Sequence, residues 1–269
     1  MASGILADMT LDEVRAFAPE AVVLGVGSTE PHGPVLPYGT DFFYCDELCR
    51  RAVVRANEQG GRVLMYPTLP IGNNVNFKAW PFACRIGVRT LMRVLLDIIA
   101  ALEEDGIRKV VLVNGHGGNT DTLRATLREH FGVTDPDRRA FVCLTGGSAF
   151  WPEAREVIEH PSDHGGERET SRIMHLHPDL VHAEHLQDLP FGRPLVEFRA
   201  NRPVYYVRPW HLHVPLGGGG ETRRSSAEKG RLDIEASCRG LAEFLVELCA
   251  LPWHPRFPYP PGDAAIEHP

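Results

Sequence analysis

Short apolar runs alternate with amphipathic segments of helical length along most of the chain. Short, mainly apolar runs predict buried strands at 21–26, 62–66, 109–113, 141–144 and 204–207. Segments with helix formers, apolar stripes or terminal glycines predict helices near 41–58, 91–102, 120–131, 167–175 and 227–249. Strands separated by helices are typical of βαβ units. The pattern therefore predicts an α/β fold whose mainly parallel sheet is covered on both faces.

Composition narrows the class of protein further. The 269 residues are 43% hydrophobic and 23% charged, which is typical of globular proteins and excludes disordered, collagen-like and coiled-coil chains. The length would allow two domains. Because no low-complexity linker, repeat or shift in composition divides the chain, we expect a single domain over 1–269, with a Pro-rich tail at 252–269.

The balance of charge bears on partners and location. Lys and Arg number 28 against 35 for Asp and Glu, a net charge of −7, which argues against nucleic acid or an anionic membrane as partner. The first residues lack the pattern of a secretory signal and no apolar run is long enough to span a bilayer, so we expect a cytoplasmic protein. Six cysteines without a C-x-x-C pair predict buried thiols rather than a thiolate zinc site.

Histidines and carboxylates gather where predicted strands end. Glu30, His32 and Asp41 follow the first strand, His116 follows the third, and Glu167 opens a later helix. Ligands of open α/β sheets bind at the carboxyl ends of the strands, and imidazole with carboxylate suits zinc or manganese. Asp41 is well placed to bridge two ions roughly 3.5–4 Å apart.

Two other interpretations of these residues remain. Each one alone is typical of a turn, a helix cap or a satisfied polar side chain. The glycines at 115–118 and 217–220 allow a phosphate site, but neither stretch has the spacing of a nucleotide-binding loop.

Four ordered motifs give the chain a family resemblance. Residues 27–41 (GSTEPHGPVLPYGTD), 114–119 (NGHGGN), 164–171 (HGGERETS) and 226–230 (SAEKG) are similar to the motifs of the creatininase (creatinine amidohydrolase) family. The resemblance extends from about residue 21 to 249 and implies a three-layer α/β/α sandwich. It also implies a metal-dependent hydrolase, commonly assembled as a hexamer, that acts on a small molecule.

The resemblance also implies roles for single residues. Glu30 and His116 would bind one divalent ion and His32 the other, with Asp41 bridging both and the ions being zinc, manganese or iron. Glu167 would complete the second site, because Gly118 stands where creatininase proper has a glutamate. His164 matches a histidine proposed for proton transfer, and Glu169 a nearby carboxylate, so both are candidate catalytic residues.

Two stretches depart from the family pattern and are candidate substrate contacts. Asn73, Asn74 and Asn76 replace a loop that carries Ser, Glu and His in many relatives, and their amides suit a neutral polyhydroxy or amide ligand. An Asn-rich turn is the alternative. Trp210, His211 and His213 could line the pocket or remain ordinary surface or core residues.

The function expected from these observations is metal-dependent hydrolysis at a carbonyl of a small, polar, cyclic substrate. Cleavage of a C–N amide and ring-opening C–C hydrolysis of a keto-inositol both remain open. A non-catalytic metal-binding member of the family is the third possibility, although both proton-transfer candidates are present.

Overall fold

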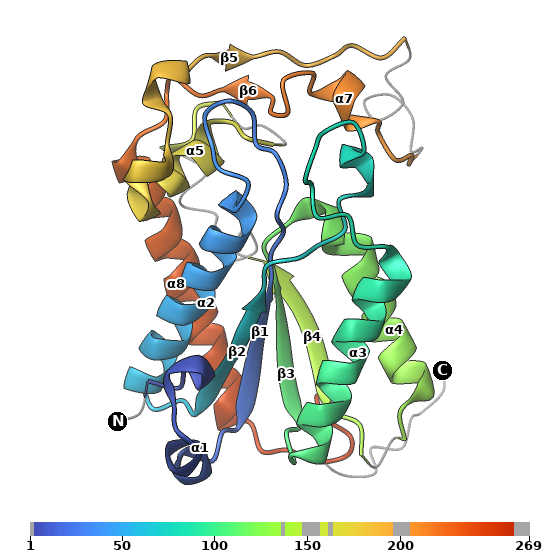
Figure 1. Cartoon of the computed structure of the whole chain (residues 1–269). Coiled ribbons are helices and arrows are strands. Elements are labelled where there is room, and N and C mark those ends of the chain that lie inside the picture. Colours follow the sequence, from blue (N-terminus) through green and yellow to red (C-terminus); the bar gives the residue numbers. More distant parts are fainter. Residues whose placement is uncertain (1–2, 136–137, 147–156, 161–163, 196–204, 261–269) are drawn as a thin grey trace, which may run out of the picture.

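Four parallel strands form the centre of the molecule (Figure 1). The computed structural model describes residues 3–135, 138–146, 157–160, 164–195 and 205–260. The strands are β1 (Ala21–Val26), β2 (Val63–Leu69), β3 (Lys109–Asn114) and β4 (Phe141–Gly146), in the order β2-β1-β3-β4. Because β1 lies between two neighbours under helices on both faces, all six of its residues are buried, which explains its unbroken apolar sequence.

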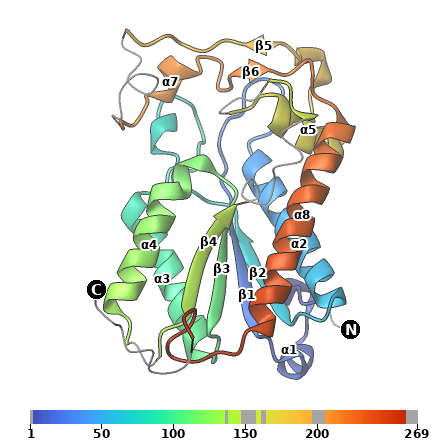
Figure 2. The same ribbon diagram turned by 180° about the vertical axis from the view of Figure 1, so that it is seen from behind.

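Helices cover both faces of this sheet (Figures 1 and 2). On one face α2 (Thr40–Glu58) and α8 (Ala227–Ala250) pack over alternate strand residues such as Val23 and Val111. On the other, α3 (Val88–Glu104) and α4 (Thr120–Val133) pack over Val22 and Leu112. Side chains alternate between the faces of a strand, so the two helical layers have separate cores. The predicted three-layer α/β/α sandwich is confirmed.

A cap lies over the carboxyl ends of the strands (Figure 1). It contains α5 (Glu167–Leu176), α7 (Trp210–His213) and an antiparallel pair, β5 (Asp188–Leu189) with β6 (Gly220–Glu221). The helix α1 (Leu11–Phe17) lies at the opposite end of the sheet. Short 3-10 helices complete the described elements: η1 (Leu6–Asp8), η2 (Val75–Phe77), η3 (Gly117–Asn119), η6 (Pro178–Leu180) and η7 (Ala183–His185).

Two expectations about strands differ from the structure. The second strand continues through Pro67 to Leu69 instead of ending at the proline. It lies at the edge of the sheet, where a residue without a backbone N–H is tolerated. The strand expected at 204–207 is wrong for residues 205–207, which are irregular and exposed, while residue 204 lies outside the described ranges.

The Pro-rich tail is described as far as residue 260. It forms no regular helix or strand over 252–260, and the Phe257 ring lies against Phe141 of β4 with centroids 5.0 Å apart. Residues 261–269 lie outside the described ranges.

A glycine sets the distance between α2 and the end of β3. A Cβ atom at Gly115 would lie 2.5 Å from the Cβ of Cys45 and 3.0 Å from the backbone oxygen of Asp41. Only glycine therefore fits here without moving the helix. This close approach brings the first turn of α2, with Asp41, beside the loop that carries His116.

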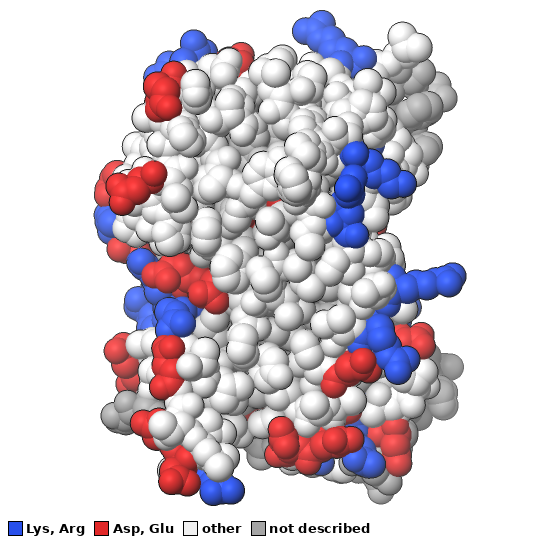
Figure 3. All heavy atoms as spheres, viewed as in Figure 1, with Lys and Arg blue, Asp and Glu red and all other residues white. Residues whose placement is uncertain are grey.

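The described surface gives two further facts. Figure 3 shows acidic and basic side chains interspersed along the left and lower margins of this face, around a largely uncharged centre. Among the helices described, none combines the length and the apolar character needed to cross a bilayer.

Candidate metal centre

A buried cluster of carboxylates and imidazoles lies at the carboxyl ends of the strands, under the cap. The loop after β1 supplies Glu30 and His32, the first turn of α2 supplies Asp41, and the loop after β3 supplies His116. At most 7% of each of these residues is exposed. Residues separated by more than 80 positions therefore meet at one point, because parallel strands end at the same edge of the sheet.

Asp41 lies between two histidines and faces both. Its Oδ2 is 3.0 Å from His116 Nδ1, and its Oδ1 is 3.4 Å from His32 Nε2. His116 Nε2 lies 3.2 Å from Glu30 Oε2, and His32 Nε2 lies 3.9 Å from Glu169 Oε2. Three groups with metal-ligand spacing result. Glu30–Asp41–His116 and His32–Asp41–Glu169 share Asp41, and the third group is Glu30–His32–His164.

Three buried atoms of this cluster make no well-directed hydrogen bond among the residues described: Glu30 Oε1, His32 Nε2 and Asp41 Oδ2. The last two lie close to each other's side chain or to His116, but at angles that do not suit a hydrogen bond. Unsatisfied buried polar atoms are costly and rare in proteins. Carboxylate oxygens and imidazole nitrogens that converge in this way are the ligands that zinc and manganese prefer. The residues present therefore fit a divalent metal.

Charge in the cluster is balanced in the way a cation site requires. Burial raises the pKa of Glu30 to about 8. Burial lowers the pKa values of the histidines, but Asp41 and its neighbouring carboxylates outweigh it and raise that of His32 to about 10 and that of His116 to about 9. Burial also raises the pKa of Asp41, yet the two histidines hold it well below its usual range. Without a metal, protons on the histidines neutralise the carboxylates, and a divalent ion can replace those protons.

His164 lies beside the cluster in an uncharged form. Its ring is 4.2 Å from the His32 ring, and its Nδ1 is 3.8 Å from Glu30 Oε1. Burial, followed by the neighbouring His32, lowers the pKa of His164 to about 3. The Nε2 atom lies 2.8 Å from the backbone oxygen of Pro31, so it carries the hydrogen and leaves Nδ1 free to accept a proton.

Glu167 does not lie with the ligand groups, contrary to the expectation for it. Its carboxylate is fully buried, with Oε1 2.6 Å from Lys229 Nζ of α8. Glu169 reaches the cluster in its place. Residues two apart on a helix point about 200° away from each other, so the two glutamates of α5 cannot face the same site. The expectation that Glu167 completes the second site is therefore wrong for this structure.

The structure also gives a reason for Gly118 in this chain. A Cβ atom at this position would lie 2.4 Å from the backbone oxygen of Asn73 and 2.4 Å from His116 Nε2. No side chain fits there unless His116 moves, so the loop after β3 offers no second carboxylate. A small cavity of about 10 Å³, the space for one water, lies between Asp41, Glu169 and Arg172.

The amides expected to contact substrate are used in part within the protein. Asn73 donates from its side chain to Thr122 Oγ1 (3.2 Å). Asn74 donates to a backbone oxygen of the loop after β1 (2.9 Å) and accepts from Ser28 Oγ (2.9 Å). Both asparagines are buried, whereas Asn76 is half-buried on η2. The buried pair thus holds the loop after β2 against its neighbours.

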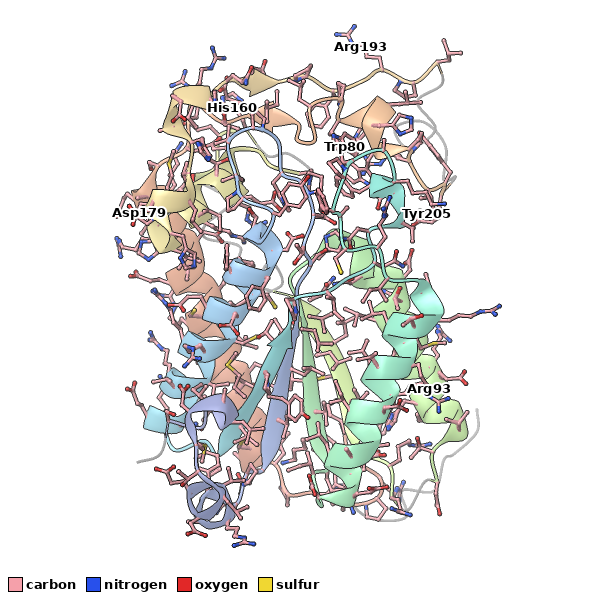
Figure 4. The ribbon with its side chains drawn as sticks, viewed as in Figure 1. Trp80, Arg93, His160, Asp179, Arg193 and Tyr205 are labelled. Carbon is pink, nitrogen blue, oxygen red and sulfur yellow. The ribbon has the colours of Figure 1, made fainter. Side chains whose placement is uncertain are left out.

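Aromatic rings form a wall on the His164 side of the cluster. Phe77 is fully buried and stacks on Trp210 with ring centroids 5.4 Å apart and planes 12° apart. Both rings lie 5.2 Å from the His164 ring. Trp80, labelled in Figure 4 above the strands, lies 5.5 Å from Phe77. We name Phe77, Trp80 and Trp210 the aromatic wall.

The two histidines after Trp210 lie at the edge of this wall. The His213 ring is 5.4 Å from the Trp210 ring and contacts Arg208, while the His211 ring is 6.5 Å from the Trp80 ring. Sequence reasoning did not select Phe77 or Trp80. An aromatic residue in a loop after a strand carries no periodic signal, and only its packing against His164 distinguishes it.

Carboxylates and imidazoles with metal-ligand spacing at the carboxyl ends of a parallel sheet, with a histidine beside them, fit a metal-dependent hydrolase of the α/β sandwich class. The family profile for creatinine amidohydrolase, Creatininase, matches residues 7–245. The chain belongs to the creatininase family, and the predicted resemblance is confirmed.

Individual relatives agree with this assignment. A creatinine amidohydrolase of Pseudomonas putida is 28% identical over 87% of this chain and 92% of its own length. A 3-dehydro-scyllo-inosose hydrolase of Thermotoga maritima is 24% identical over 97% and 88%. A manganese form of creatininase has a TM-score of 0.74 at 25% identity, and a zinc–zinc form of a creatininase mutant has 0.73, also at 25%. Each covers 93% of this chain and 100% of its own.

Proposed function

We propose that this chain holds two divalent ions and hydrolyses a small, polar, cyclic substrate at a carbonyl group. The observation that carries the proposal is Asp41, whose two oxygens face His116 and His32 of separate ligand groups. Glu30 and His116 would complete one site, and His32 and Glu169 the other. Zinc and manganese suit this donor set, as does iron.

Bound divalent ions lower the pKa of a water molecule toward neutrality and polarise a carbonyl oxygen. The chain's own residues then control the proton. His164 is the candidate proton carrier, because its Nδ1 bears no hydrogen and lies 3.8 Å from Glu30 Oε1. From there it would take a proton from a water in the site and return it to the leaving atom. The Pro31 carbonyl fixes the ring by accepting from Nε2.

The aromatic wall and the buried asparagines bear on the substrate. Phe77 and Trp210 place apolar surface beside His164, which suits the face of a ring and excludes water from that side. Asn73 and Asn74 use polar atoms in internal hydrogen bonds, so they offer less to a polyhydroxylated ligand than expected. Both facts favour a cyclic amide over a polyol.

Ring-opening C–C hydrolysis of a keto-inositol is the second candidate. The inosose hydrolase of Thermotoga maritima aligns with 97% of this chain, more than the P. putida enzyme does. The two candidates differ in their products. Cleavage of a cyclic C–N bond produces a new carboxylate together with a new N–H group, whereas C–C cleavage produces the carboxylate together with a new C–H bond.

The test is a substrate panel with the zinc- and manganese-loaded protein, containing creatinine, 3-dehydro-scyllo-inosose and a formamidopyrimidine nucleotide. Products are identified by NMR. Turnover that disappears in His164→Asn, while the metal content stays unchanged, supports the proposal. A loaded protein that hydrolyses none of these compounds and no simple lactam would contradict it.

We also propose a cytoplasmic homo-oligomer, which the family resemblance implies to be a hexamer. Large apolar side chains on the cap and its neighbouring loop support an interface between copies. Phe82 is 89% exposed and Tyr205, at the margin in Figure 4, is 70% exposed. Light scattering of the purified protein measures the number of copies.

A further inference from the structure

Glu167 has more hydrogen-bond donors around it than a helix cap requires. Its Oε1 accepts from Lys229 Nζ at 2.6 Å and from the backbone N–H of Glu159 at 3.3 Å. Its Oε2 accepts from the backbone N–H of His160 at 2.7 Å. The residue is fully buried, and a buried carboxylate persists only when it is paired and hydrogen-bonded in this way.

All three hydrogens of the Lys229 ammonium group have acceptors. Besides Glu167, its Nζ donates to Glu159 Oε1 at 2.9 Å and to the backbone oxygen of Arg224 at 2.9 Å. An ammonium group has three hydrogens, and three acceptors surround this one. The side chain is only 19% exposed, so the ion pair is better shielded from solvent than an ordinary surface pair.

The helices that carry these two residues are fixed against each other. A Cβ atom at Gly230 would lie 1.9 Å from the backbone oxygen of Ser171, so α8 approaches α5 as closely as backbones allow. One turn further along, Arg172 of α5 contacts the fully buried Asp233 through Nε and, at 3.3 Å, through Nη2. The position of α5 on α8 is therefore fixed at two successive turns.

We propose that Lys229 and Glu167 form a buried latch that positions the segment 157–160 and the start of α5, and with them His164, while the Arg172–Asp233 contact independently holds α5 and Glu169. His164 lies three residues before Glu167, and Glu169 lies two residues after it. The Glu169 carboxylate in turn accepts from the backbone N–H of Gly165 at 2.5 Å. Lys229 and Glu167 are thus positioning residues, and their connection to catalysis rests on the proposed function.

The latch gives separate roles to two sequence motifs. Lys229 belongs to the motif at 226–230, which supplies no residue to the candidate ligand groups, and Glu167 belongs to the motif at 164–171. Their contact joins the last helix to the loop that carries His164. In this arrangement Glu167 holds backbone and not metal, which makes the proposal separable from a ligand role.

The experiment compares Lys229→Met and Glu167→Gln with the wild type in the full-length protein. Two properties are measured, residue-resolved hydrogen exchange at the amides of residues 159 and 160 and zinc per chain after loading. Lys229→Arg is the conservative rescue. Glu228→Gln is the matched control, because Glu228 is the exposed neighbour on the same helical turn and pairs with Arg231 instead.

We expect hydrogen exchange at both amides to become about tenfold faster in Lys229→Met, which is the change expected when one hydrogen bond that protects them is lost. Glu167→Gln should do the same, while amides of β1 stay protected. Both variants should keep the zinc content of the wild type, Lys229→Arg should restore slow exchange, and Glu228→Gln should match the wild type. Should Lys229→Met fail to fold, Lys229→Gln and Glu167→Gln carry the same test.

Two results would overturn the latch. One is unchanged exchange at residues 159 and 160 in both variants. The other is a loss of zinc in Glu167→Gln that Lys229→Met does not share, which would make Glu167 a ligand. A wild type that takes up no zinc, manganese or iron would defeat the proposed function, yet faster exchange in the variants would still support the latch.

Discussion

Sharing of Asp41 between two ligand groups predicts a stepwise response of stability to metal. Asp41→Asn removes a ligand from both groups, whereas Glu169→Gln removes one from the group with His32 only. Glu167→Gln removes none, because Glu167 faces α8. The three variants should therefore keep no site, one site and two sites.

The magnitude follows from mass action. At a free metal concentration of 100 times Kd, each occupied site stabilises the folded state by about 2.7 kcal/mol. Two sites add about 5 kcal/mol by the same relation. For chains of this size 1 kcal/mol shifts Tm by roughly 2–4 °C. The wild type and Glu167→Gln should then gain roughly 10–20 °C, Glu169→Gln roughly half of that and Asp41→Asn almost nothing.

Differential scanning calorimetry with zinc and with a chelator measures this gain, and elemental analysis counts the ions independently. Each variant serves as its own baseline, so a change in the stability of the metal-free protein does not enter the comparison. A gain in Glu169→Gln equal to that of the wild type would show that Glu169 is no ligand. A full gain in Asp41→Asn would refute the shared site.

Three further outcomes are expected. Zinc affinity should rise with pH between 6 and 9, because the pKa values of His32 and His116 are raised to about 10 and about 9 and binding must displace their protons. Competition with a chromophoric chelator measures the affinity. An affinity that does not change with pH would contradict this assignment. Phe77→Ala should lower the free energy of unfolding, measured by urea titration, by about 3–5 kcal/mol, because the ring is fully buried. Phe77→Leu is the milder control. A loss below about 1 kcal/mol in Phe77→Ala would mean that the aromatic wall is not packed as described. Gly118→Ala should lower the free energy of unfolding by about 1–3 kcal/mol and weaken zinc binding, because the new methyl group would displace His116. Gly117→Ala is the control and should change neither property, since a Cβ atom there meets nothing within 4 Å. Equal behaviour of the two variants would contradict the steric argument.

The sheet and its helices could be predicted from the sequence because each element has a periodic signal. The strand β1 and the centre of β3, Val110–Val113, are apolar runs that are buried on both faces. The irregular cap has no such period. Residues 205–207 have a strand-like composition, yet they meet no partner strand among the described residues. Without a partner their β propensity has no effect.

Convergence of the candidate ligands could also be predicted, because it follows from the parallel sheet. Which glutamate of α5 faces the cluster could not. The choice between Glu167 and Glu169 depends on the rotation of that helix about its axis, which Lys229 and Asp233 fix from α8. The hydrogen bonds of Asn73 and Asn74 could not be predicted either, because they too depend on the tertiary structure: their partners lie 45 to 49 positions away in the sequence.

The two candidate ligand groups that share Asp41 are completed at different points along the chain. Glu30, Asp41 and His116 all precede residue 117, together with the three strands whose ends support them. Glu169 comes more than fifty residues later, and the helix that orients it packs on α8, near the end of the described chain. During synthesis from the N-terminus, a growing chain would therefore possess one complete set of ligands well before it possesses the other. Under the proposed function, the ion held by Glu30, Asp41 and His116 would therefore bind before the ion that needs Glu169.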